Sequence, residues 1–208
     1  GIVKCRGHIP SNIVTQTWFS FLIQHGIKPY QGTLNGIMFD FAIKGMQLVS
    51  TRSGARYDGK GNKVVVNGHP IYWSEEYFKN HYFNNKWQVY SDKLAKMTCK
   101  ANKSTRGEVV SRISRLFQHI FVDEVQDMAG YDLDIIKLLF QSPSRILLVG
   151  DPRQVTYLTH HEAKYGKYID GMIKAFIENE CSRIKEIEID ETSLSVSHRN
   201  NKAVCDFS

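Results

Sequence analysis

The sequence predicts an α/β fold in which helices flank a parallel sheet, and two short apolar runs are the clearest sign of it. Residues 119–124 (HIFVDE) and 145–151 (RILLVGD) each read as a buried strand that ends in acidic side chains. Between them, residues 131–140 carry apolar side chains at helical spacing, and a Ser-Pro pair follows that is expected to end the helix. Asp123 and Asp151 are 28 residues apart, about the length of a strand–helix–strand crossover between parallel strands.

A basic segment of mixed character precedes these strands. Residues 54–73 are predicted to form a β-hairpin, because a YDGKGN turn and an Asn-Gly pair punctuate short apolar runs. Residues 75–98 are rich in aromatic side chains and predict a helix, whose aromatic stripe is better explained by core packing than by base stacking. Residues 44–115 hold 14 Lys and Arg against 5 Asp and Glu, a net of +9, whereas the rest of the chain holds 13 against 16, a net of −3. This asymmetry fits a surface that faces a polyanion, and equally a solvated lysine-rich surface.

The composition is that of an ordinary folded protein. With 208 residues, 42% of them hydrophobic, the chain can bury a core and form one or two domains. No apolar run approaches the ~20 residues that cross a bilayer, and no leading segment resembles a secretion signal. The four cysteines form no CxxC pair, so we expect reduced thiols, no cysteine metal site and a cytoplasmic protein without a membrane partner.

Acidic side chains stand where an α/β sheet binds its ligands, at the carboxyl ends of the strands. Asp123, Glu124 and Asp151 occupy these positions. One carboxylate there can hold Mg²⁺ while its neighbour accepts a proton from an attacking water. Acids at strand ends also cap helices or face solvent, so the pair by itself indicates no more than a metal-binding function.

The residues around these acids form two longer motifs. Residues 123–127 (DEVQD) resemble the DExQD form of the Walker B motif in the UvrD/Rep/PcrA-like superfamily 1 DNA helicases. Residues 148–157 (LVGDPRQVTY) resemble the next motif of that family, GDxxQxIY, and follow at the family's distance. By this resemblance, Gln126 and Asp127 are expected to support the site rather than to take part in the chemistry.

Two further segments resemble motifs that flank these in the family. Residues 13–22 (IVTQTWFSFL) are similar to the early T-x-H-x-F segment that contacts single-stranded DNA, which implies DNA contacts by Thr15, Thr17 and Phe19. Thr17 stands where the family has its histidine. Residues 194–201 (LSVSHRNN) are similar to the motif that ends in Tyr-Arg-Ser, with a histidine in the place of the tyrosine.

The resemblance assigns a role to each matching residue. Asp123 would hold Mg²⁺, and Glu124 would orient or deprotonate the attacking water. Gln154 would sense the γ-phosphate of ATP, and Arg199 would reach that phosphate with its planar guanidinium. Tyr157 stands where the family places an aromatic side chain near the DNA; a packed tyrosine is an almost equally good interpretation.

The resemblance also implies a domain organisation. A partial P-loop NTPase (RecA-like) parallel sheet with helices would be interrupted by an inserted basic α+β subdomain. Residues 1–33 would begin motor domain 1A, and residues 34–112 would be the insertion that lies beside the DNA. Residues 113–192 would complete domain 1A, and residues 193–208 would start motor domain 2A. The family's insertion is mostly helical, so the hairpin predicted here departs from it.

The phosphate-binding loop GxxxxGK[ST] does not occur in the 208 residues, since residues 59–63 (GKGNK) lack its spacing and hydroxyl. We therefore expect a helicase fragment that hydrolyses ATP poorly or not at all by itself. Its parent would use ATP and Mg²⁺ to move on single-stranded or partly duplex DNA; a nuclease, repair or defence partner stays unidentified.

Two other functions compete with a helicase motor. One is a non-catalytic nucleic-acid-binding module derived from such a motor, and the other is a P-loop ATPase that shares only a Walker B motif. The matches at Gln154 and Arg199 weigh against the second. A module without catalysis has no physical need to keep Asp123 and Glu124 as well.

Overall fold

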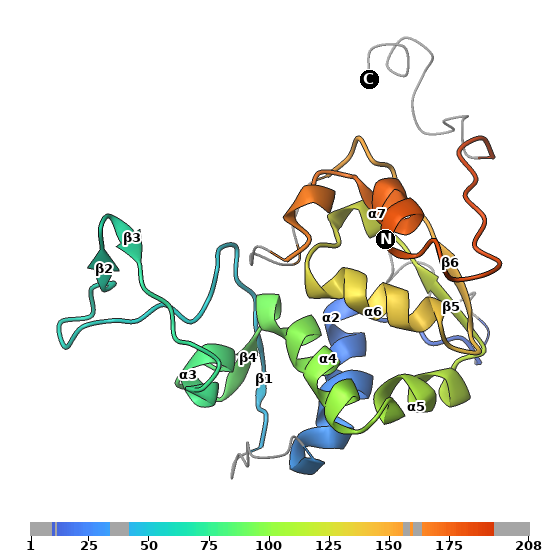
Figure 1. Ribbon diagram of the computed structural model, residues 1–208. Coiled ribbons are helices and arrows are strands. Elements are labelled where there is room, and N and C mark those ends of the chain that lie inside the picture. Colours follow the sequence, from blue (N-terminus) through green and yellow to red (C-terminus); the bar gives the residue numbers. More distant parts are fainter. Residues whose placement is uncertain (1–9, 11, 34–41, 156–158, 160–163, 194–208) are drawn as a thin grey trace.

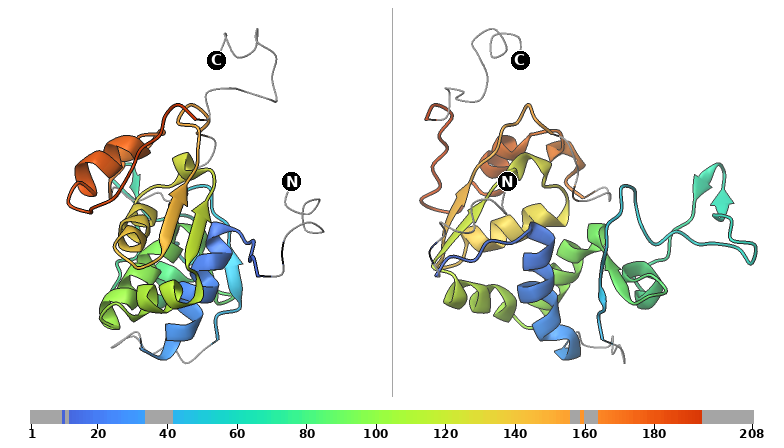
Figure 2. Two further views of the ribbon diagram at one scale, coloured as in Figure 1. Left: turned by 90° about the vertical axis from the view of Figure 1, so that its right-hand side faces the viewer. Right: turned by 180° about the vertical axis from the view of Figure 1, so that it is seen from behind.

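A computed structural model of the protein describes residues 10, 12–33, 42–155, 159 and 164–193. Strands β5 (His119–Val122) and β6 (Arg145–Leu148) run parallel, with His119 opposite Arg145 and Val122 opposite Leu148. Helix α6 (Tyr131–Phe140) connects them and lies on one face of the pair, and α2 (Trp18–Phe21) lies on the other face (Figure 2). The predicted strand–helix–strand unit is confirmed, and the architecture is mixed α/β. The expectation that both strands are buried was wrong, because Phe121 of β5 and Leu147 of β6 are 72% and 51% exposed in the structure.

Helix α6 forms where the sequence repeats apolar side chains every three or four residues. Leu133, Ile136 and Leu139 are completely buried, because they lie on the face that packs into the body. Two acids in its first turn, Asp132 and Asp134, suit the positive end of the helix dipole.

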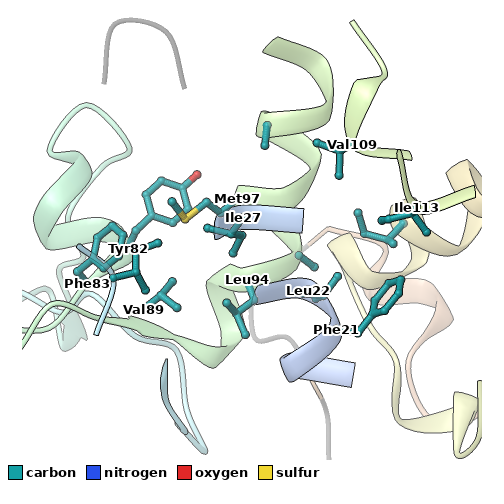
Figure 3. Close-up of a cluster of buried hydrophobic side chains, with 14 of the residues drawn as sticks. Phe21, Leu22, Ile27, Tyr82, Phe83, Val89, Leu94, Met97, Val109 and Ile113 are labelled. Carbon is teal, nitrogen blue, oxygen red and sulfur yellow. The ribbon is translucent and has the colours of Figure 1, made fainter. Parts of the chain in front are cut away.

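The larger hydrophobic cluster surrounds helix α4 (Leu94–Ser104). The π-helix η2 (Leu22–Ile27) packs against it, and Figure 3 shows Leu22 close to Leu94 and Ile27 close to Met97. Further helical segments of this region are η3 (Lys28–Thr33), η4 (Ser91–Lys93) and α5 (Glu108–Leu116). The cluster thus joins segments from the first third of the chain to helices that lie far from them in sequence.

A second hydrophobic cluster joins the sheet to the last helices. Val122 of β5 packs with Leu133 of α6 and with Phe176 of α7 (Ile173–Glu180). Trp18 and Ile120 pack against both clusters, so the two cores are continuous. The short 3-10 helices η5 (Val125–Asp127) and η6 (Gly166–Tyr168) complete this region.

The predicted hairpin is present and projects from the body (Figure 1). Strands β2 (Val65–Val66) and β3 (His69–Pro70) pair antiparallel across Asn67 and Gly68. Both turn residues have positive φ angles, 50° and 79°, as a tight turn built on Asn-Gly requires.

The helix predicted for residues 75–98 is interrupted, and this prediction was wrong in its middle. Helix α3 (Phe78–Tyr82) ends at a turn in which the Asn84 side chain accepts hydrogen bonds from the backbone N–H groups of Lys86 and Gln88. Strand β4 (Gln88–Tyr90) follows and pairs in parallel with β1 (Gly45–Gln47). Within the described ranges, no helix combines the length and apolar character needed to cross a membrane.

Candidate functional site

The sheet brings the two acidic strand ends to the same edge. Beyond the register of β5 and β6, Val149 N–H donates to the Val122 carbonyl (2.8 Å) and Val125 N–H donates to the Val149 carbonyl (3.1 Å). The two segments therefore stay hydrogen-bonded beyond both strands, as far as Val149 after β6 and Val125 after β5, which places Asp123, Glu124 and Asp151 at one edge. The side chains of Asp123 and Glu124 are exposed there.

Gln126 connects the two segments that follow the strands. Its Nε2 donates to Glu124 Oε2 (2.6 Å) and to the main-chain carbonyl of Gln154 (3.3 Å). The Gln126 side chain is buried, so the bond restricts the rotamers of an otherwise exposed Glu124 carboxylate. The arrangement holds a water-accessible carboxylate in a fixed direction, which is what a general base needs.

Glu124 has a left-handed backbone conformation, with φ of 54° and ψ of 40°. A side chain with a Cβ adopts this region rarely, and such strain is concentrated at functional sites. The Glu124 N–H donates to Asp123 Oδ1 (3.0 Å), which ties the two acids together.

Gly150 allows the two segments to approach closely. A Cβ at this position would lie 2.3 Å from Gln126 Oε1 and 3.1 Å from the backbone N of Val125. Gln126 Oε1 is buried and accepts no hydrogen bond within the described part of the chain. Any side chain at position 150 would therefore displace the residue that orients Glu124.

Gln154 and Arg153 are both engaged by Asp151. The Asp151 carboxylate accepts from Arg153 Nε (3.1 Å), Arg153 Nη2 (3.2 Å) and Gln154 Nε2 (2.8 Å). The hydrogen bonds from Arg153, followed by the one from Gln154, lower the pKa of Asp151 to about 2. The Gln154 amide points at Asp151, while its main-chain carbonyl faces Gln126.

The three residues of segment 13–22 that were predicted to contact DNA differ in their exposure to solvent. Thr15 is exposed, and the Thr17 hydroxyl caps helix α2 by accepting from the Ser20 N–H (3.2 Å). Phe19 is half-buried and packs against the larger cluster. Thr15 and Thr17 therefore stand at the surface, whereas Phe19 contributes to the core.

Trp18 links this segment to the sheet in a way that the sequence motifs do not reveal. Its indole N–H donates to Asp132 Oδ1 (2.6 Å) in the first turn of α6. Asp132 is 2% exposed, and burial raises its pKa to about 6, although hydrogen bonds from Thr159 and Trp18 oppose the rise. An acid at the start of a helix ordinarily reads as an exposed cap, so no sequence signal identified Asp132 as a buried partner.

Thr159 ties the segment after Gln154 back to the turn that follows β5. Its N–H donates to the Asp127 carbonyl (3.1 Å), and its hydroxyl accepts from the Ala129 N–H (3.1 Å). Two contacts thus connect residues 123–127 to the segment after β6, one from Gln126 to Gln154 and one from Thr159 to Asp127. Tyr157 and Arg199 lie outside the described residues.

The donor set at the edge of the sheet fits Mg²⁺ bound together with a nucleotide. No group of three or more His, Cys, Asp or Glu side chains in the described ranges is arranged to hold a metal ion by itself. Mg²⁺ usually takes one or two carboxylates and completes its shell with water and substrate phosphates. Asp123 is exposed and can supply such a carboxylate, with Glu124 beside it.

Comparisons with known proteins agree with these motifs. Residues 65–166 match the UvrD/REP helicase N-terminal domain. A probable DNA helicase II homolog of Mycoplasma genitalium is 38% identical over 81 residues, which cover 39% of this chain and 11% of that protein. No solved structure matches the chain. The matched residues include the whole of the 123–127 and 148–157 motifs, and the two comparisons together support a fragment of a UvrD-like helicase.

Proposed function

We propose that this chain forms part of an ATP-driven DNA motor, in which hydrolysis of ATP with Mg²⁺ moves a helicase along single-stranded DNA. The observation that carries the proposal is the Glu124–Gln126–Gln154 connection across the ends of β5 and β6. It joins the proposed base to the segment that would sense the nucleotide, within one hydrogen-bonded unit.

Each residue has a distinct task in this proposal. Asp123 would hold Mg²⁺, which supplies charge neutralisation for the transferred phosphoryl group. Glu124 would accept the proton of the attacking water, and Gln126 would keep its carboxylate aimed. Gln154 would exchange its bond with Asp151 for one to the γ-phosphate, and Arg199 would stabilise the same phosphate.

The DNA-binding part of the proposal rests on the early segment 13–22 and on residues 44–115, whose 14 Lys and Arg against 5 Asp and Glu give a net charge of +9. Thr15 and Thr17 are exposed at the start of α2, and Trp18 anchors that start to Asp132. In this proposal, Asp132 and α6 would connect the nucleotide edge to the DNA-contacting segment. Tyr157 would add an aromatic contact to a base, worth about 1–3 kcal/mol.

A glutamate-to-glutamine change tests the proposed base in the natural gene product that contains this chain. Glu124→Gln keeps the size and a hydrogen bond to Gln126 but cannot accept a proton, so DNA-stimulated ATP hydrolysis should fall about 100-fold or more. Single-stranded DNA binding should persist. Glu188→Gln, at an exposed glutamate away from the site, is the matched control and should retain full turnover.

Unchanged turnover in Glu124→Gln would refute the assignment of the base. The 208-residue chain on its own should hydrolyse ATP poorly or not at all, because it contains no GxxxxGK[ST] loop. Strong DNA-stimulated hydrolysis by this chain, abolished by Glu124→Gln, would contradict that expectation.

A further inference from the structure

Residues 151–154, here called the 151–154 turn, form one rigid unit. The Gln154 N–H donates to the Asp151 carbonyl (3.0 Å) and closes a β-turn, and the Asp151 carboxylate accepts from the Arg153 N–H (3.1 Å). Pro152 occupies the second position of the turn, where its ring fixes φ at about −65°. A displacement of Pro152 therefore moves Gln154 with it.

Gly171 lies directly against this turn. A Cβ on Gly171 would overlap the carbonyl oxygen of Pro152 and lie 2.9 Å from the carbonyl carbon. Gly171 is buried, and its φ of 79° lies in the left-handed region. Both the backbone conformation and the close approach therefore require a residue without a side chain.

Helix α7, labelled in Figure 1, begins two residues after Gly171 and is fixed in the second hydrophobic cluster. Phe176 is fully buried there, and its ring meets the ring of Tyr168 edge to face, with the ring centres 5.4 Å apart. The Tyr168 hydroxyl donates to Glu180 Oε1 (2.9 Å), which connects η6 to the end of the helix. Because these contacts hold α7 in place, Gly171 determines how closely the 151–154 turn can approach the helix.

The other side of the turn is bounded by Gln126. Its Nε2 donates to the Gln154 carbonyl (3.3 Å), and a Cβ on Gly150 would overlap its Oε1. The turn is thus confined between Gln126 and Gly171. A simpler explanation of the Gly171 contact is dense core packing alone. The two explanations differ in their consequences, because only confinement of the turn makes the Gln154 side chain move when position 171 gains a methyl group.

We propose that Gly171 is a positioning residue for Gln154, because it sets the distance between α7 and the 151–154 turn. Gln154 Nε2 donates to Asp151 Oδ2 (2.8 Å), and the geometry of this bond depends on where the turn lies. The inference rests on the proposed function in one respect, which is the role of Gln154 at the γ-phosphate. Gly171 would touch neither the nucleotide nor the metal and would act only through Pro152.

The first test follows the Gln154 side-chain amide in the purified 208-residue chain without nucleotide. Its ¹H–¹⁵N NMR signals are identified by their loss in Gln154→Ala. Gly171→Ala should shift these signals, because the added methyl group pushes the turn and changes the hydrogen bond to Asp151. Unshifted signals in a folded Gly171→Ala protein would overturn the proposal.

Two other glycines provide matched controls. Gly68 has the same φ of 79°, and Gly166 lies in η6, close to Gly171 in sequence. Among the described residues, no atom lies within 4 Å of a Cβ at either position. Gly68→Ala therefore adds backbone strain without a clash, and Gly166→Ala adds a methyl group in open space, so both should leave the Gln154 signals in place. Shifts in these controls as large as that in Gly171→Ala would reduce the effect to general destabilisation and contradict the proposal.

The second test measures DNA-stimulated ATP hydrolysis by the natural gene product that contains this chain. In Gly171→Ala, kcat should fall about 10- to 100-fold, as a misplacement of about 1 Å can cause, while KM for ATP should change by less than about threefold. In a Gln154→Ala background the same substitution should have no further effect, because Gly171 acts only through Gln154. Losses that multiply in the double variant would show that Gly171 acts by another route. Gly166→Ala should retain full turnover.

A change in the turn itself keeps the test decisive if Gly171→Ala does not fold. Pro152→Gly frees φ at an exposed position, so the turn loses its rigidity and Gln154 is uncoupled from α7. The Gln154 signals should then shift or broaden, and unchanged signals would refute the link. Thermal unfolding midpoints show which variants fold.

The NMR signals require no ATP, so their outcome is separable from that of the Glu124→Gln test. Shifted Gln154 signals in Gly171→Ala, together with unchanged turnover in Glu124→Gln, would support the positioning of Gln154 and reject only the proposed base. Unshifted signals together with a loss of turnover in Glu124→Gln would keep the base and reject the role of Gly171.

Discussion

Asp132 shows how one buried residue can join two parts of a site that local sequence motifs treat separately. Its carboxylate lies 2.6 Å from the Trp18 indole nitrogen, and it forms no ion pair with the described residues. A buried carboxylate with two neutral hydrogen-bond donors and no cation is disfavoured in its charged form. That is the reason its pKa rises to about 6.

The raised pKa predicts a pH-dependent contribution to stability. Because the folded pKa of Asp132 (about 6) lies above its ordinary value of 3.8, the protonated form favours folding. This stabilisation is complete below about pH 4 and is lost as the pH rises through about 6. Asp132→Asn cannot ionise, so at pH 7 it should unfold with a free energy up to about 3 kcal/mol higher than the wild type.

Urea denaturation of both proteins between pH 4 and pH 7 measures this difference. The advantage of Asp132→Asn should grow over that interval and be small at its acidic end. A difference in unfolding free energy that stays constant from pH 4 to pH 7 would show that Asp132 does not titrate in that interval. Trp18→Phe provides a second check, because it removes the indole N–H but keeps an aromatic ring. Its cost of about 1–3 kcal/mol in unfolding free energy should be smaller in the Asp132→Asn background.

At the scale of elements, the sequence predicted what is encoded by neighbouring residues. Strands β5 and β6 and helix α6 follow from short apolar periodicities, and the β2–β3 turn follows from Asn67-Gly68. The pairing of β1 with β4 was not predictable, because two three-residue strands about 40 residues apart carry no periodic signal of their own. Val89 of β4 is fully buried in the larger hydrophobic cluster, so contacts with segments distant in sequence contribute to that pairing.

The residues of the candidate site likewise fall into those that local motifs identify and those that depend on contacts distant in sequence. Asp123, Glu124 and Gln154 are recognisable because their motifs are contiguous and follow strands. The roles of Trp18 and Thr159 depend on contacts between segments 114 and 30 residues apart, Trp18 with Asp132 and Thr159 with Ala129. Contacts at such separations are set by the packing of the two hydrophobic clusters, which a motif cannot specify.

The contact between helices η2 and α4 yields a prediction at this scale. A Cβ added to Gly26 would lie 2.6 Å from both Thr98 Cγ2 and Thr98 Oγ1. Gly26→Ala should therefore lower the free energy of unfolding by about 1–3 kcal/mol through overpacking, in spite of alanine's better helix propensity.

A double variant identifies the cause. Thr98→Ala removes both opposing atoms and should by itself have little effect, since the Thr98 hydroxyl is buried without a hydrogen-bond partner in the described ranges. Gly26→Ala/Thr98→Ala should regain most of the stability lost by Gly26→Ala, as measured by chemical denaturation. Additive losses would place the strain elsewhere.

For the whole molecule, the body and the projecting hairpin, here called the arm and comprising residues 52–73, differ in what holds them together. Trp18 and Ile120 connect the two hydrophobic clusters into one body. Between Met46 and Phe78 neither cluster has a member, so the arm lies outside both cores. Val65 and Val66 of β2 are each at least half exposed, which means that the hairpin buries little apolar surface.

This separation predicts that the arm can be shortened without unfolding the body. Replacing residues 57–70 by Asn-Gly keeps Arg56 N–H opposite the Ile71 carbonyl, a 2.8 Å hydrogen bond, and closes the stem with a tight turn. The free energy of unfolding should change by less than about 1 kcal/mol, because a surface change away from the core is usually this small. Leu133→Ala, in the buried face of α6, is the contrasting variant and should lose about 2–5 kcal/mol. Denaturation followed by both circular dichroism and tryptophan fluorescence measures the two changes. A loss for the shortened arm as large as that for Leu133→Ala would mean that the arm supports the core, whereas an unchanged midpoint would show that the body folds independently of the arm.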